Sequence, residues 1–130
     1  MFLIHKTDDG HVPPLEYLPS GAITPKLGLA LVFSNGTLAV CSGGNKPQYI
    51  CMTQRGAAVA AATPIPVVRV TPDIIFETVF SGSAAAIKAG DKVTISSDGM
   101  GLSSTTTNGV AEVVSLDGNT GGSKVRVRFD

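Results

Sequence analysis

Short runs of β-branched and aromatic residues recur along this chain, and each run stops at a Gly, Pro, Asn or Asp cluster. The turn signals arrive at intervals of roughly 8 to 12 residues, and no long stretch follows the 3.6-residue period of a helix. This spacing predicts an all-β fold, a small barrel or sandwich. The chain of 130 residues is long enough to bury a core of its own as one domain.

Two local patterns give the clearest strand predictions. Asn35-Gly36 separates two apolar runs, which predicts a β-hairpin because a type I′ turn needs positive φ at both central residues. Residues 124–129 alternate strictly between charged and apolar side chains. That period of two predicts a strand with one buried face, formed by Val125, Val127 and Phe129.

Further strands are expected at residues 48–54, 65–70, 74–80, 91–97 and 110–116. Residues 65–70 and 74–80 are interpreted as two strands around the turn 71–73. The Ala-rich residues 57–62 are too few for a stable helix and are expected to connect strands. A short helical turn is expected at residues 84–88, so the fold class is all-β, or mainly β with one or two short helical turns.

Residues 1–26 contain four of the eight prolines, which remove backbone donors and favour extended conformations. This segment is predicted to be an extended N-terminal arm, followed by a single β-rich domain over residues 27–130. The apolar side chains of the arm are spaced as in a strand laid over a surface, its own or a neighbour's. They are the candidate residues for contact with another subunit: Leu15, Tyr17, Leu18 and Ile23.

Charge and composition narrow the classes of partner. Ten basic and ten acidic residues give a formal net charge of zero, which disfavours nucleic acid as the main partner and leaves little repulsion against self-association. The apolar start of the chain is too short for a signal peptide, and no apolar run approaches the ~20 residues of a membrane span. Two cysteines predict reduced thiols made in the cytoplasm, although one disulfide stays an alternative.

The residues that carry chemistry are few and scattered. His5 and His11 fall in the arm, where a histidine is expected to be solvated or locally hydrogen-bonded, and Cys41 and Cys51 are expected to pack as small hydrophobes. Adjacent Asp8 and Asp9 would point apart in an extended chain, so carboxylate pairs depend on tertiary contacts. We therefore predict no catalytic residue, no metal site and no cofactor, and hence no enzyme.

Three cations follow one face of the final predicted strand: Lys124, Arg126 and Arg128. Such a basic stripe can contact phosphates. It is also typical of a solvated edge strand, where outward Lys and Arg prevent pairing with other chains. The same face has no aromatic residues on which bases could stack, so the edge-strand interpretation is favoured.

The chain resembles the small capsid decoration (cement) proteins of tailed bacteriophages and prophages. The resemblance covers residues 17 to 129, and it rests on the order and spacing of seven segments: residues 17–22, 46–52, 65–70, 75–78, 90–95, 109–114 and 121–129. Each segment alone is unspecific, because similar strands and turns occur in many β domains.

The resemblance implies a structural virion protein, made in the bacterial cytoplasm, that binds the outer surface of a phage head and stabilises the capsid lattice. Its partners would be the major capsid protein and, in a homotrimer, itself. On this view, deleting residues 1–26 abolishes capsid binding and leaves the barrel folded. The alternative is a non-enzymatic β-barrel adaptor that binds a small ligand or nucleic acid through the basic C-terminal strand.

Overall fold

The computed structural model describes residues 1–130 and consists of strands joined by turns and loops, without helices, so the all-β prediction is confirmed. None of its segments is a long apolar helix of the kind that crosses a membrane. The ten strands, in chain order, are β1 (Leu3–Thr7), β2 (Leu15–Ser20), β3 (Ala30–Ser34), β4 (Thr37–Val40), β5 (Tyr49–Cys51), β6 (Thr63–Arg69), β7 (Ile74–Val79), β8 (Lys92–Val93), β9 (Ala111–Leu116) and β10 (Lys124–Phe129).

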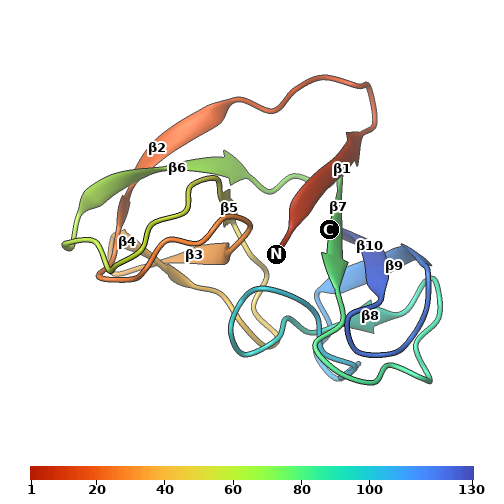
Figure 1. Ribbon diagram of the computed structural model, residues 1–130. Helices are drawn as coiled ribbons and strands as arrows, with labels where there is room; N and C mark the ends of the chain where they lie inside the picture. Colours follow the sequence, from red (N-terminus) through yellow and green to blue (C-terminus); the bar gives the residue numbers. More distant parts are fainter.

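The strands form two sheets that lie side by side (Figure 1). One is a closed barrel with the order β2-β4-β3-β5-β6, and the other is a five-stranded sheet with the order β1-β7-β10-β9-β8. The chain starts in the five-stranded sheet, crosses into the barrel after β1 and returns after β6. Residues 8–14 and 70–73 make these two crossings, and we call them the crossing segments.

The two clearest local predictions are confirmed. Asn35 and Gly36 have φ of 51° and 83°, as a type I′ turn requires, and they join β3 to β4. In β10 the side chains of Val125, Val127 and Phe129 are completely buried. The alternating pattern therefore identified the buried face of this strand correctly.

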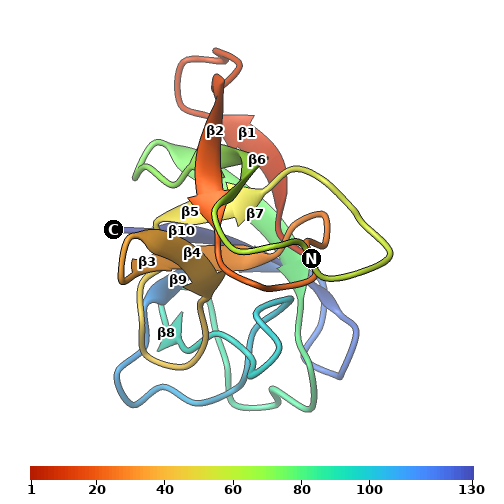
Figure 2. The same ribbon diagram turned by 90° about the vertical axis from the view of Figure 1, so that its left-hand side faces the viewer.

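Buried apolar residues gather in two clusters. Seven fill the barrel: Leu29, Leu31, Leu38, Tyr49, Cys51, Ile65 and Val67. A cluster of 18 lies mainly under the five-stranded sheet, but the barrel strands add Ala30, Ile50 and Val68 to it. Viewed from the barrel side, β9 and β10 lie behind β3 and β4 (Figure 2). The larger cluster therefore joins barrel and sheet into one body.

Backbone hydrogen bonds outside the strands also hold the two parts together. The amide of Ala30 in β3 donates to the carbonyl oxygen of Gly99 at 2.9 Å. Gly43, which follows β4, exchanges two hydrogen bonds with Ile95, at 2.9 and 3.0 Å. The segment between β8 and β9 thus connects the barrel to the sheet through main-chain hydrogen bonds, in addition to apolar packing.

The prediction of a separate arm at residues 1–26 needs correction, because this segment supplies a strand to each sheet. β1 pairs antiparallel with β7, and β2 pairs with β6 along six residues, from Leu15↔Val68 to Ser20↔Thr63. Phe2 is buried in the larger cluster. Proline tolerates these positions because its missing amide matters only where the strand needs a donor. Deleting the segment would therefore open the barrel.

Residues 84–88 form a single turn and no helix: the Ile87 amide donates to the Ala84 carbonyl oxygen at 2.9 Å, and the Ala84 amide donates to Asn119 at 2.8 Å. Residues 57–62 connect two strands, as expected, and Val59 donates to Ile23 at 3.0 Å. So few residues cannot offset the cost of starting a helix, and tertiary hydrogen bonds take its place.

Candidate functional site

The two crossing segments run next to each other, because they continue the pairing of neighbouring strands. Thr7 pairs with Ile74 at the end of the five-stranded sheet, and Leu15 pairs with Val68 at the start of the barrel. Between these pairs the amide of Asp8 donates to the carbonyl oxygen of Asp73 at 2.9 Å. Polar side chains of both segments are therefore brought together at the junction of barrel and sheet.

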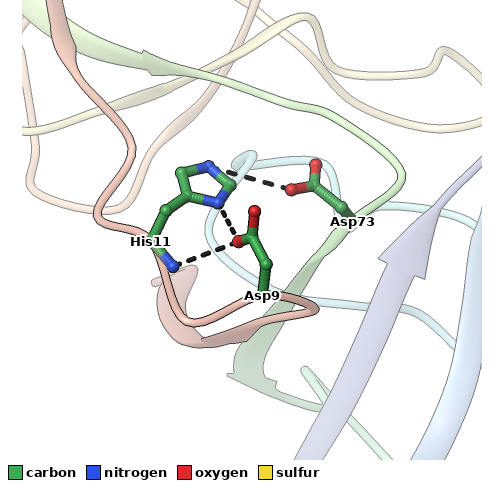
Figure 3. A group of neighbouring side chains, drawn as sticks. All are labelled: Asp9, His11 and Asp73. Atoms are coloured by element: carbon green, nitrogen blue, oxygen red, sulfur yellow. Dashed lines mark hydrogen bonds and ion pairs between the residues drawn. The ribbon is translucent and has the colours of Figure 1, made fainter.

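Asp9, His11 and Asp73 form a cluster at this junction (Figure 3). His11 Nδ1 is in hydrogen-bond contact with Asp9 Oδ1, which also accepts from the His11 amide at 3.1 Å. On the other side of the ring, Nε2 lies 3.8 Å from Asp73 Oδ2. The imidazole of His11 thus lies between two carboxylates that come from different crossing segments.

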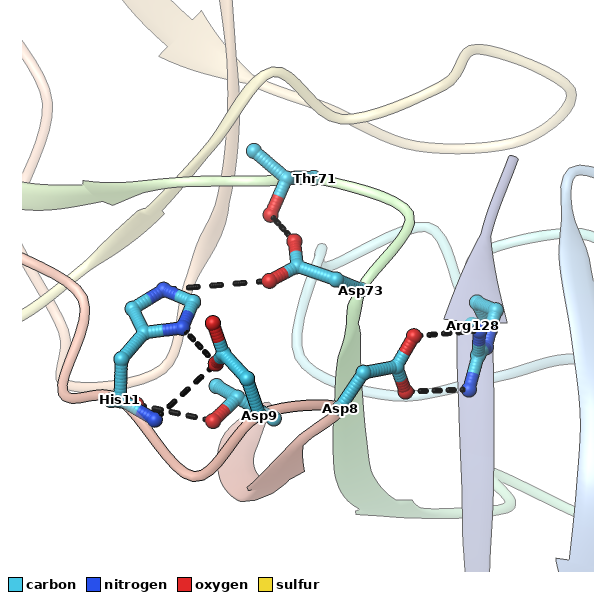
Figure 4. Close-up of polar contacts among 7 residues, drawn as sticks. Asp8, Asp9, His11, Thr71, Asp73 and Arg128 are labelled. Atoms are coloured by element: carbon cyan, nitrogen blue, oxygen red, sulfur yellow. Dashed lines mark hydrogen bonds and ion pairs between the residues drawn. The ribbon is translucent and has the colours of Figure 1, made fainter.

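Neighbouring groups hold this cluster in place (Figure 4). The Thr71 hydroxyl donates to Asp73 Oδ1, which leaves Oδ2 facing the ring. The Thr7 hydroxyl donates to the His11 carbonyl oxygen at 2.8 Å. Asp8 turns away from the cluster and pairs with Arg128 at 3.1 Å. The two adjacent aspartates therefore point apart, as the sequence predicted, and only Asp9 joins the cluster.

Electrostatics favour the charged forms of His11 and Asp9. The hydrogen bond that His11 donates to Asp9 raises the pKa of His11 and outweighs the opposite effect of desolvation, and the charges of Asp9 and Asp73 raise it further. The hydrogen bonds from His11 lower the pKa of Asp9. The carboxylates on both sides of the His11 imidazole thus stabilise its protonated, positively charged form.

Two hollows open beside His11. One of about 420 Å³ is lined by residues from β1 and the first crossing segment, including Ile4 and Lys6. The other, of about 130 Å³, reaches the ion pair of Glu16 with Arg69. The side chain of His11 is 44% exposed, so water and small ions can reach the ring.

The four candidate contact residues do not share one face. Leu15 and Tyr17 lie on the outer face of β2 with 51% and 67% of their surfaces exposed. Leu18 and Ile23 are partly buried and pack against the barrel core. Only the first two are therefore available to another molecule.

The strand that carries the basic stripe, β10, is not an edge strand. β10 lies between β7 and β9, so the edge-strand interpretation was wrong. Arg126 binds Asp117 through both terminal nitrogens, at 2.7 and 3.1 Å, and Glu77 through Nε at 3.1 Å. Arg128 binds Asp8, and only Lys124 remains exposed without an ion pair.

The two cysteines are free and buried, one in each core. Burial raises the pKa of the Cys41 thiol to about 11 and also raises that of Cys51. The Cys41 thiol donates to the Asn45 carbonyl oxygen and that of Cys51 to Thr53, at 3.2 and 3.3 Å. Both therefore behave as small core residues, as the sequence predicted.

Sequence reasoning missed the cluster around His11. Asp9 and His11 are close in the sequence, but Asp73 lies in the other crossing segment, and no local pattern connects it with them. No known protein-family model and no curated protein matches the sequence.

Proposed function

We propose that this protein is a structural subunit of the capsid decoration type, which binds other protein subunits through the outer face of β2. The observation that carries the proposal is the exposure of Leu15 and Tyr17 on a regular strand of a closed barrel. β2 is paired with β6 along its whole length, so a partner that approaches the outer face of β2 would meet these side chains. The shell of a phage head and the other protomers of a trimer are the proposed partners.

The surroundings of these two residues suit an interface. Tyr17 is paired with Pro66, and Pro19 with Pro64, on the neighbouring strand β6. Proline and tyrosine lose little conformational freedom when they are buried, and tyrosine is enriched in protein interfaces. A formal net charge of zero opposes neither trimer formation nor dense packing on a lattice.

The alternative, an adaptor that binds nucleic acid through β10, is less well supported. Two of the three cations in the stripe already hold Asp117, Glu77 and Asp8, and a phosphate would have to displace these carboxylates. Filter binding of the unmodified protein to single- and double-stranded DNA at low salt tests this alternative. Strong, salt-sensitive binding would favour the adaptor over the decoration protein.

Two substitutions test the proposed interface. Leu15→Ser with Tyr17→Ser should convert a trimer into a monomer in sedimentation equilibrium. It should also abolish co-sedimentation with expanded phage-head shells that the unmodified protein binds. Both side chains point outward, so circular dichroism should stay unchanged. Deleting residues 1–26 is unsuitable, because it removes strands from both sheets.

Val114→Ser on β9 is the matched control, since Val114 is similarly apolar and 41% exposed on the other sheet. It should leave assembly and shell binding unchanged. A monomeric unmodified protein that does not bind shells would overturn the proposal. Shell binding that survives the double substitution would show that the outer face of β2 is not the interface.

A further inference from the structure

The cluster at the junction has the composition of a metal site. Asp9, His11 and Asp73 each offer one ligand atom, and these three atoms all lie within 4.8 Å of one another. In a tetrahedral zinc site the ligand atoms lie ~2.0–2.2 Å from the metal, and hence roughly 3.3–3.6 Å from one another. Asp9 contacts Nδ1 whereas Asp73 faces Nε2, so an ion held by one ring nitrogen requires the His11 ring or the Asp9 carboxylate to rotate. Exposed side chains make such movements easily.

We propose that Asp9, His11 and Asp73 bind a divalent transition-metal ion of the zinc class, with water completing the coordination. One imidazole nitrogen and two carboxylate oxygens suit Zn²⁺, Co²⁺ or Ni²⁺. Mg²⁺ and Ca²⁺ prefer oxygen ligands only, so the imidazole selects against them. The ion competes with a proton for His11, because a metal-binding imidazole must be neutral. Two carboxylates and the neutral imidazole then balance the charge of a divalent ion.

The ligands are held by outer contacts of the kind that support metal sites. Thr71 binds one oxygen of Asp73 and leaves the other free to face the site. The Asp8 amide ties its crossing segment to the Asp73 carbonyl oxygen. Arg128 pairs with Asp8 rather than with the cluster, so its positive charge is already compensated.

The position of the cluster gives the metal a consequence for the fold. Asp9 and His11 belong to the first crossing segment and Asp73 to the second, and these are the two covalent connections between barrel and sheet. A bound ion would cross-link them beside the hydrogen bond that already joins them. Binding to the folded chain alone should therefore stabilise it.

The test uses the full chain, freed of metal with EDTA and dialysed, and ZnCl₂ as the probe. Calorimetric titration should show one Zn²⁺ per chain. At about a hundredfold excess over the dissociation constant, the melting temperature should rise by roughly 5 to 10 °C. MgCl₂ at the same concentration should have no such effect.

His11→Ala should weaken zinc binding more than about 100-fold, beyond the loss expected for an outer contact. Asp73→Asn, which keeps the shape of the side chain, should weaken it in the same direction. His5→Ala is the matched control, because His5 is equally exposed and also lies near a carboxylate, 3.8 Å from Glu77. Circular dichroism without metal verifies that each variant is folded.

Three results would overturn the proposal. Unchanged zinc affinity in His11→Ala would exclude the imidazole as a ligand, and an equal loss in His5→Ala would show unspecific histidine binding. An equal response to Mg²⁺ would reduce the cluster to an acidic surface. The proposal is independent of capsid binding, since zinc is measured on the isolated chain.

Discussion

The barrel and the five-stranded sheet contain five strands each, but they are stabilised in different ways. The barrel closes on itself around seven buried residues, of which only Tyr49 is aromatic. The sheet has two edge strands and covers 18 buried residues, including Phe2, Phe76, Phe80 and Phe129. Closure thus supplements the smaller core of the barrel, because each barrel strand has a neighbour on both sides. The sheet depends on its aromatic core.

Few contacts close the barrel. β2 and β4 are joined by the parallel pair Ser20↔Leu38, next to a hydrogen bond from the Gly21 amide to the Leu38 carbonyl oxygen at 2.8 Å. The shared cluster supports this closure from outside, through Ala30, Ile50 and Val68. The barrel therefore depends more on the sheet for its stability than the sheet depends on the barrel.

Among the changes considered, truncation of one buried side chain in each core should lower the free energy of unfolding most. Phe76→Ala removes a ring that packs on Phe129 with centroids 5.9 Å apart, and should lower the free energy of unfolding by about 3–5 kcal/mol. Leu38→Ala should cost about 2–3 kcal/mol, because a small core can partly close over the gap. Urea unfolding followed by circular dichroism measures both. A larger loss for Leu38→Ala would reverse the comparison.

Two glycine substitutions should separate steric clash from backbone strain. At Gly109, near β9, an added Cβ would lie 2.2 Å from the Lys92 carbonyl oxygen, so β8 must move, at a cost of about 3 kcal/mol. At Gly36, in the barrel hairpin, nothing lies within 4 Å and only the positive φ of 83° opposes the change. Gly36→Ala should cost about 1 kcal/mol. Equal unfolding midpoints would contradict this order.

The reaction rates of the two thiols should report on the opening of the two cores separately. The expected difference in opening free energy is the smallest of the effects predicted. Neither should react with iodoacetamide in the native protein at pH 8, because both are buried and their raised pKa values keep them protonated. In urea below the unfolding transition, Cys51 in the barrel should react about tenfold faster than Cys41, which corresponds to ~1.4 kcal/mol of easier opening. Mass spectrometry of the peptides gives both rates. Equal rates would show that barrel and sheet open together.

Patterns within a few residues predicted the strands well, and predicted their partners poorly. Residues 65–70 and 74–80 were expected as strands around a turn, and β6 and β7 are there. Yet β6 pairs with β2 and β5, whereas β7 pairs with β1 and β10. The turn between them is a crossing from barrel to sheet. Strand propensity says nothing about which edge a strand will find.

The prolines of residues 1–26 were misleading for a related reason. An extended, proline-rich segment has the same local pattern whether it is free or paired, because proline removes one donor and leaves its carbonyl oxygen available. Leu18 and Ile23 then turned inward while Leu15 and Tyr17 stayed exposed. The candidate interface is thus half of the predicted set.

The sequence by itself determined the all-β class, the Asn35-Gly36 hairpin and the buried face of the last strand, because each depends on backbone preferences and side-chain alternation within a few residues. Only the tertiary structure placed β10 in the middle of its sheet and neutralised Arg126 and Arg128 with distant carboxylates. It also brought Asp73 to His11, since contacts between crossing segments arise only after barrel and sheet have packed together.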